Sequence, residues 1–253
     1  FVHGKCKFSD ITVKLAEDFR EYLMNATSIS SVHKSKVTLS RNTSSKYFSL
    51  FRNILRQAYK EQFLKINVSD YLDYIPREQA EIRQFLTMDE VRILYNTPCV
   101  YDVLKNAAMF SIFTGLRFSD IYDLDWSHIT TAPDGKPCIV KQIVKTRRNA
   151  TIYISDEALQ FCGERKEEGR VFPYLRKSMT KAPLHNWIKR SGIQKHITFH
   201  CFRHTNATLL ASSGINIYTV KDQLVHTHVN TTEIYAKLLD TNKRAAAEAI
   251  TLR

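Results

Sequence analysis

The chain has 253 residues, 43% of them hydrophobic, and carries a formal net charge of +12 at pH 7. This length and apolar content suffice for two domains with separate cores, while no apolar run is long enough to span a bilayer. The five cysteines are odd in number and form no C-x-x-C pair, which suits a reducing cytoplasm and predicts free thiols. We therefore expect a soluble, cytoplasmic protein without a membrane association or a signal peptide, whose partner is an acidic polymer.

Apolar residues recur at helical spacing in the first 75 residues. The first predicted helix carries Ile11, Leu15, Phe19 and Leu23 on one face. The second runs from about residue 44 to 64 and turns Tyr47, Phe51, Ile54, Ala58 and Leu64 inward. Residues 1–75 are thus predicted to form a small helical domain.

Basic residues are concentrated in two stretches that contain no acidic residue, 22–60 and 169–221. A charged run is usually only a solvated face, but two such stretches in a chain with 25 acidic residues favour phosphate contact. In the first stretch, the expected nucleic-acid contacts are Lys34, Lys36, Arg41, Lys46, Arg52 and Arg56.

The periodic pattern is interrupted after residue 75, and we expect a linker over residues 76–86. Thr87-x-x-Glu90 then forms a predicted capping box that opens a second domain over residues 87–253. An apolar helix from Val103 to Phe113 follows, with Gly115 as its C-cap.

Two alternating segments in the middle of the chain predict a β-hairpin. They are Cys138–Lys145 and Thr151–Ile154, and they flank the polar sequence Arg147-Arg148-Asn149. Lys145 stands at the end of the first segment.

The last third of the chain combines residue types that suit phosphoryl transfer without a metal. A helix beginning near Thr198 places His200 and Arg203 on one face at its N-terminus, where an anion is favoured. Gly214 ends this helix, residues 216–224 form a second, and residues 231–239 form a third that carries Tyr235. His226 and Tyr235 can then approach the same phosphate-binding pocket.

Each of these residues also has an ordinary structural interpretation. Arg117 after the Gly115 cap could simply pair with Asp120 or Asp123, and one tyrosine among 12 is more often a core or surface aromatic. His204 follows His200 by one helical turn, as in a metal pair, but no Glu follows His200 and no third ligand is evident. His204 is therefore expected to be a core or supporting residue.

Several positions taken together resemble a known family. His200-x-x-Arg203-His204-Thr205, Leu224-x-His226 and Tyr235, nine residues after that histidine, resemble the C-terminal signature of tyrosine recombinases, the phage-integrase family. Residues 113–121 resemble the family's first-arginine box, with Arg117 as the arginine. The resemblance covers about residues 8 to 240, and Val225 departs from it because the family usually has Gly there.

The resemblance implies a mainly α fold with a small β-hairpin or sheet, in which a helical, SAM-like core-binding domain precedes the catalytic domain. It implies that Tyr235 attacks a DNA phosphate to form a 3′-phosphotyrosyl bond while Arg117 and Arg203 hold the phosphate oxygens. His200 is the first choice for removing the phenolic proton. Lys145 would protonate the leaving 5′-oxygen, His226 would bind the phosphate, and Asp120 would orient Arg117 or Lys145.

The resemblance also implies partners and a biological role. Double-stranded DNA is the expected substrate, a homotetramer on DNA is the expected assembly, accessory DNA-bending proteins are compatible with it, and no metal or nucleotide cofactor is required. The preferred function is integration and excision of a mobile element. The alternatives are a recombinase that resolves chromosome dimers, a type IB topoisomerase, and a catalytically silent DNA-binding protein. Because the chain begins with Phe1, a piece of a longer integrase lacking its arm-binding domain also fits.

Overall fold

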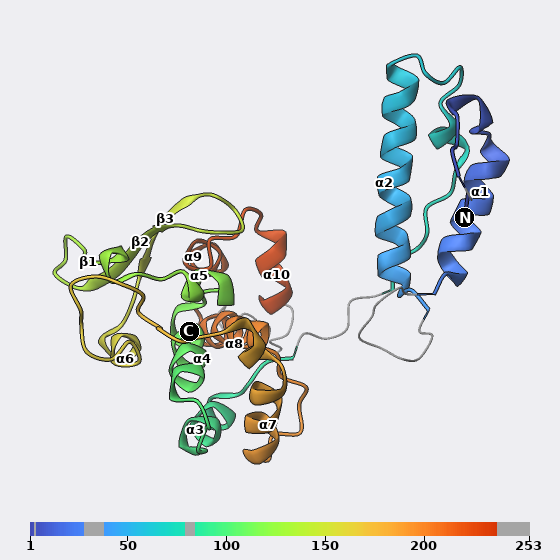
Figure 1. Cartoon of the computed structure of the whole chain (residues 1–253). Helices are drawn as coiled ribbons and strands as arrows, with labels where there is room; N and C mark the ends of the chain where they lie inside the picture. The colour runs from blue at the N-terminus through green and yellow to red at the C-terminus, as the bar shows by residue number, and fades with distance from the viewer. Residues whose placement is uncertain (3, 28–37, 79–83, 237–253) are drawn as a thin grey trace, which may run out of the picture. The chain divides into compact units, whose positions relative to one another are not determined.

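The computed structural model describes residues 1–2, 4–27, 38–78 and 84–236. The chain divides into two compact units, Phe1–Glu81 and Ile82–Arg253, here called the N-terminal unit and the C-terminal unit (Figure 1). Within the described ranges, no helix has the length and apolar character needed to cross a membrane.

The N-terminal unit is built on two helices, α1 (Val13–Asn25) and α2 (Arg41–Lys60), which lie side by side in Figure 1. The 3-10 turns η1 (Phe8–Asp10) and η2 (Val68–Tyr71) flank them. Thr12 and Ser40 cap the two helices by accepting hydrogen bonds from backbone N–H groups one turn later. The unit has its own core, formed by Ala16, Leu23, Phe48, Leu55, Ala58, Leu64, Val68, Leu72 and Ile75.

The buried face of α2 differs from the predicted one. Tyr47 and Ile54, predicted to point inward, are 49% and 55% exposed, whereas Phe48 and Leu55 are each 1% exposed. Two serines explain this rotation, because Ser44 and Ser45 donate hydrogen bonds to carbonyl groups outside the helix and so fit on its buried face. Ala58 and Leu64 are buried as predicted and Phe51 packs against the core, so the prediction was wrong at Tyr47 and Ile54 only.

The C-terminal unit is larger and mainly helical, with one small sheet. Its elements are α3 (Met88–Asn96), α4 (Asp102–Thr114), α5 (Phe118–Tyr122), η3 (Trp126–His128), β1 (Ile129–Thr131), β2 (Pro137–Gln142), β3 (Asn149–Tyr153), α6 (Asp156–Gln160), η4 (Lys177–Thr180), α7 (Ala182–Arg190), α8 (Phe199–Ser212), α9 (Ile217–Gln223) and α10 (Asn230–Ala236).

Helices α4 and α8 form the centre of this unit and pack against each other. Both are buried around most of their circumference, as expected of helices surrounded by other elements. Helix α10 packs on α8 and α9, so the segment that carries Tyr235 lies against the segment that carries Arg203. This packing brings the last third of the chain onto the end of α4.

The sheet is antiparallel in the order β1-β2-β3. Ile139 on β2 stands opposite Ile129 on β1 and Ile152 on β3, and all three side chains are buried. The predicted hairpin is confirmed, although β2 ends at Gln142 and not at Lys145, and β1 was not predicted. Residues 143–148 form the turn between β2 and β3, and the Ile143 N–H donates a hydrogen bond across it to the Arg148 carbonyl at 2.9 Å.

Several local predictions are confirmed. Thr87 and Glu90 form the reciprocal capping box of α3. Gly115 ends α4 in the left-handed conformation, with φ +71°. Helices α8, α9 and the described part of α10 occur where they were expected, while residues 237–239 of the third predicted helix lie outside the described residues. The fold is mainly α with a small antiparallel sheet, as predicted.

Candidate active site

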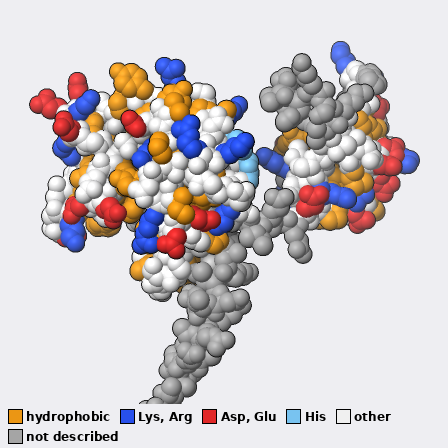
Figure 2. All heavy atoms as spheres, turned by 90° about the horizontal axis from the view of Figure 1, so that it is seen from below, with side chains coloured by type: hydrophobic (Ala, Val, Ile, Leu, Met, Phe, Trp, Pro, Cys, Tyr) orange, Lys and Arg blue, Asp and Glu red, His pale blue; other side chains and the backbone are white. Residues whose placement is uncertain are grey.

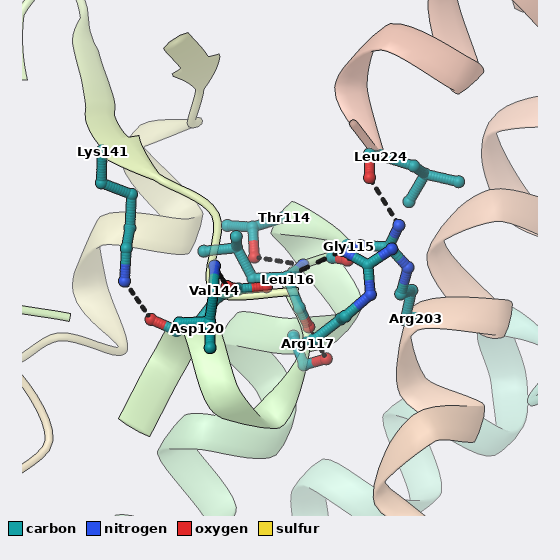
Figure 3. A network of polar contacts seen from close by, with 10 residues as sticks. Thr114, Gly115, Leu116, Arg117, Asp120, Lys141, Val144, Arg203 and Leu224 are labelled. Carbon is teal, nitrogen blue, oxygen red and sulfur yellow. Dashed lines mark hydrogen bonds and ion pairs between the residues drawn. The ribbon is translucent and has the colours of Figure 1, made fainter. Parts of the chain in front are cut away.

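Arg203 lies at the centre of the site, on the inner face of α8, and is 3% exposed. Its Nη1 donates a hydrogen bond to the Gly115 carbonyl at 2.6 Å, and its Nη2 donates to the Leu224 carbonyl. Figure 3 shows the guanidinium group between these two carbonyls, one at the end of α4 and one at the end of α9. Arg203 therefore ties together three segments that are far apart in sequence.

Arg117 stands directly before α5, and the structure pairs it with Asp120. Its Nη1 is 3.9 Å from Asp120 Oδ2, and no hydrogen-bond partner of this nitrogen is found among the described residues. The other Asp120 oxygen, Oδ1, accepts a hydrogen bond from the Val144 N–H at 3.0 Å. Asp120 is fully buried. Because one of its oxygens lies near Arg117 and the other accepts from Val144, its carboxylate connects Arg117 with the turn that carries Lys145.

The two guanidinium groups lie close enough to repel each other. The pKa of Arg203 is lowered to about 9, chiefly by burial and also by the positive charge of Arg117, while Tyr235 and Asp120 oppose this shift. Burial also lowers the pKa of Arg117, against the raising effects of Asp120 and Tyr235. Two partly desolvated cations beside one another are unfavourable unless an anion is bound between them. The site is thus electrostatically suited to a phosphate.

Tyr235 is 1% exposed and points into this site from α10. Its phenolic oxygen is 2.6 Å from Nδ1 of His204, on α8. His200, the residue expected to accept the phenolic proton, is exposed near the start of α8, and its ring centroid lies 4.5 Å from that of His204. The structure therefore places His204, which was expected to be a core or supporting residue, against the Tyr235 hydroxyl.

His226 lies in the turn between α9 and α10 and is 8% exposed. Its Nδ1 is 2.8 Å from Oγ1 of Thr232, a fully buried residue on α10. Thr232 lies one helical turn before Tyr235, so His226 is joined to the helix that carries the tyrosine. Sequence reasoning missed Thr232, although its spacing from Tyr235 places both residues on one face of α10.

Two lysines lie near the β2–β3 turn, in different environments. Lys145 is exposed within the turn. Lys141 is buried on β2, and its Nζ donates a hydrogen bond to the Asp120 carbonyl at 2.9 Å (Figure 3). Burial lowers the pKa of Lys141, whereas Asp120 and Asp123 raise it. Lys141 thus has a structural partner in the site, while Lys145 is open to solvent beside it.

Val225, which precedes His226, adopts a positive φ of 49°. This conformation is unfavourable for a β-branched residue and suits glycine, the residue that the resemblance led us to expect at this place. The Val225 N–H still donates to the Asp222 carbonyl at 2.9 Å, and the preceding carbonyl, of Leu224, still accepts from Arg203. The departure therefore strains the backbone without removing a contact of the site.

The expected nucleic-acid contacts in the first basic stretch divide into three groups. Arg41 and Lys46 are exposed on α2, and Arg56 is partly exposed. Lys34 and Lys36 lie outside the described residues. Arg52 is 7% exposed, and this placement corrects the expectation of a surface residue.

Arg52 is occupied inside the N-terminal unit. Its Nη2 donates to the Ser69 carbonyl at 2.8 Å, and its guanidinium carbon lies 3.7 Å from the ring centroid of Tyr74. The surface of this unit is also not uniformly basic, since Asp and Glu side chains are prominent on the face shown in Figure 2. Of the predicted contacts on α2, Arg41, Lys46 and the partly exposed Arg56 therefore remain accessible to a phosphate, and Arg52 does not.

The rings of His200 and His204 lie 4.5 Å apart between centroids on α8. Among the described residues, no group of three or more His, Cys, Asp or Glu side chains is placed to hold a metal ion. His204 instead contacts Tyr235.

Two family models match the chain. Residues 84–242 match the phage integrase family, and residues 1–74 match the phage integrase SAM-like domain. Because the first match alone covers more than half of the chain, the chain belongs to the phage integrase family, whose members include the tyrosine recombinases.

Relatives with curated names support this assignment. A tyrosine recombinase of Thermosipho africanus is 28% identical over 185 residues, which are 69% of this chain and 64% of the relative. A tyrosine recombinase XerC of Bacillus pumilus is 26% identical over 246 residues, which are 89% of this chain and 80% of the relative. The chain thus spans only part of the length of these relatives.

Solved structures show the same fold. A XerH site-specific recombinase bound to its difH substrate matches with a TM-score of 0.64 and 15% identity, covering 95% of this chain and 71% of that protein. A lambda integrase dimer bound to a COC' core site matches with a TM-score of 0.63 and 20% identity, covering 92% of this chain and 82% of that protein.

Proposed function

We propose that this protein is a site-specific DNA recombinase that cuts and rejoins DNA through a 3′-phosphotyrosyl intermediate. The observation that carries the proposal is the association of two partly desolvated guanidinium groups with one buried tyrosine. Arginine binds two phosphate oxygens at once and remains charged at neutral pH, and these cations would stabilise the charge of the transition state. A tyrosine beside them is placed to act as the nucleophile.

The remaining residues have complementary roles in this proposal. Arg117 and Arg203 hold the non-bridging oxygens of the scissile phosphate, and His226, oriented by Thr232, donates a hydrogen bond to it. Lys145 protonates the leaving 5′-oxygen. Asp120 orients both sides of the site, because its carboxylate lies near Arg117 and accepts from the turn that carries Lys145.

The substrate in this proposal is double-stranded DNA. Residues 1–75 act as a core-binding domain, residues 76–86 as a linker, and residues 87–253 as the catalytic domain, working as a tetramer on DNA. The domain match over residues 1–74 and the exposed Arg41 and Lys46 support contact between the first domain and DNA. Relatives were solved as DNA complexes, which supports the same class of partner.

The biological role in this proposal is integration and excision of a mobile element. Resolution of chromosome dimers is the second candidate, since several relatives are named XerC or XerD. The two roles share the same chemistry and differ in the DNA sites that are joined.

A covalent-capture experiment tests the chemistry. The protein is incubated with a pool of duplexes that carry a randomised core and a single nick, so that cleavage releases a short fragment and traps the enzyme on DNA. We expect a denaturation-resistant protein–DNA adduct from the wild type and none from Tyr235→Phe. If the chain only binds DNA and does not cleave it, neither the wild type nor Tyr235→Phe will form an adduct.

A second assay separates a recombinase from a type IB topoisomerase. The captured sequences are cloned in pairs on a supercoiled plasmid, and the products are examined for exchange between the two copies. A recombinase exchanges the segments and depends on the captured sequence. Relaxation of any plasmid without exchange would instead identify a topoisomerase.

A further inference from the structure

The contact between His204 and Tyr235 joins two buried side chains from different helices. The His204 Nδ1 and the Tyr235 oxygen are 2.6 Å apart, and the ring centroids are separated by 5.7 Å. His204 is 8% exposed and Tyr235 is 1% exposed. A short, buried hydrogen bond of this kind fixes the direction in which the phenolic proton can move.

A phenol has an ordinary pKa of about 10 and is therefore a weak nucleophile at neutral pH until its proton is removed. A general base must lie within hydrogen-bond reach of the proton that it accepts, and an unprotonated imidazole nitrogen is suited to this task. His204 meets the geometric requirement at the phenolic oxygen itself. The nearby cations, Arg117 and Arg203, stabilise the negative charge that develops on that oxygen as the proton leaves.

His200 has a different position. It is exposed near the N-terminus of α8, where backbone N–H groups favour an anion, and its ring meets that of His204 at an interplanar angle of 79°. This position suits a hydrogen bond to the phosphate more than proton removal from a buried phenol.

We propose that His204 is a catalytic residue of this chain and accepts the phenolic proton of Tyr235 during DNA cleavage. The inference rests on the proposed recombinase function and deepens it. The Tyr235 O–H bond breaks, its proton moves to His204 Nδ1, and the phenolic oxygen forms a bond to phosphorus. The bond between phosphorus and the 5′-oxygen breaks, and Lys145 gives this oxygen a proton. In the rejoining step, a 5′-hydroxyl returns its proton to Lys145 and its oxygen forms a bond to phosphorus. The phosphotyrosyl bond breaks, and His204 returns its proton to the tyrosine oxygen.

The test compares four variants with the wild type in single-turnover adduct formation on a captured nicked duplex. His204→Asn places an amide group near the position of Nδ1, so it can keep a hydrogen bond without accepting a proton, and His204→Gln is a second version. His200→Asn tests the alternative base. His185→Asn is the matched control, because His185 is exposed on α7 outside the site. DNA affinity and thermal unfolding are measured for each protein.

We expect His204→Asn and His204→Gln to slow adduct formation by about 100-fold or more, the usual effect of losing a general base, while DNA affinity changes only a few fold. His200→Asn should retain more activity than either, and His185→Asn should match the wild type. Because the rate constant is measured on bound complexes, a loss of folded protein lowers the amplitude and leaves the rate constant unchanged.

A duplex with a 5′-thiol leaving group provides a further readout. This leaving group needs no protonation, so it should rescue Lys145→Ala but neither His204 variant. The inference is overturned if His204→Asn cleaves within a few fold of the wild type, if the thiol rescues it, or if His200→Asn is the slower variant. Absence of any adduct from the wild type would instead refute the proposed recombinase function.

Discussion

Arg203 donates a hydrogen bond to the carbonyl of Gly115 at 2.6 Å, which joins two segments separated by 88 positions in sequence. Gly115 ends α4, and Arg117 follows it after one residue. The contact therefore holds both proposed phosphate-binding arginines in one fixed arrangement. It also explains why the conformation of a glycine matters to a site whose chemistry is performed by other residues.

Gly115→Ala should destabilise the protein and reduce DNA cleavage. Gly115 has φ +71°, and an added Cβ would lie 2.5 Å from Leu224 Cδ2 and 2.7 Å from Asn206 Oδ1. The backbone strain and the overpacking should together cost at least about 2 kcal/mol in the free energy of unfolding. Gly214→Ala is the control, because Gly214 has φ +77° but an added Cβ meets no atom within 4 Å. Urea unfolding measures the free energy of unfolding of both variants. If Gly115→Ala and Gly214→Ala lose the same amount, the close packing around Gly115 does not contribute.

Tyr235→Phe should abolish covalent adduct formation while DNA affinity stays within a few fold of the wild type. Only the phenolic oxygen is lost, and the ring still fills its buried position on α10. Denaturing gels on a nicked duplex measure the adduct, and a filter-binding titration measures the affinity. A covalent product from the Phe variant would assign the nucleophile to another residue.

Arg117→Ala and Arg203→Ala should each reduce cleavage by roughly 3 kcal/mol or more in activation free energy, as expected on losing a transition-state donor. Their effects on stability should differ. Arg203→Ala leaves the buried carbonyls of Gly115 and Leu224 without their donor and should lower the unfolding temperature. Arg117→Ala removes a cation that repels Arg203, so it should lower the unfolding temperature less than Arg203→Ala does. Calorimetry measures the unfolding temperature of each variant, and single-turnover kinetics measures its cleavage rate. A larger drop in unfolding temperature for Arg117→Ala than for Arg203→Ala would contradict this prediction.

Lys145→Ala should slow cleavage of an ordinary duplex and recover with a 5′-thiol leaving group, because the general acid is then unnecessary. Lys141→Ala should behave differently. It removes the hydrogen bond from Nζ to the Asp120 carbonyl and leaves a cavity on β2, so it should reduce stability without thiol rescue. Rescue of Lys141→Ala and not of Lys145→Ala would transfer the proton-donor role to Lys141.

Changing Arg41, Lys46 and Arg56 together to Gln should flatten the salt dependence of DNA binding. Each phosphate contact releases counterions, so the slope of log affinity against log salt should fall by about 1 for each contact removed. Lys14→Gln is the control, because Lys14 pairs with Asp18 on α1 at 2.9 Å. An unchanged slope in the triple variant, measured by titration at several salt concentrations, would place the DNA footprint on residues 169–221 instead.

Local features of the fold could be predicted from sequence because they depend on neighbouring residues. The capping box of Thr87, the left-handed cap at Gly115 and the helix boundaries around Gly214 follow from hydrogen bonds and φ preferences within a few positions. The family and the candidate residues Arg117, Arg203 and Tyr235 were expected because their order and spacing resemble the tyrosine recombinase signature. These features hold regardless of how the helices pack.

Tertiary packing decided which side chains actually meet. His200 and His204 lie one turn apart on α8, so the sequence allows either one to contact Tyr235. The packing of α10 on α8 places the Tyr235 hydroxyl against His204. Arg52 likewise belongs to a basic run in sequence, yet a carbonyl from η2 and the Tyr74 ring hold it in the core. Residue type and spacing define which contacts a side chain is able to make. The choice among them depends on segments that are distant in sequence, because burial and hydrogen-bond satisfaction are properties of the assembled fold.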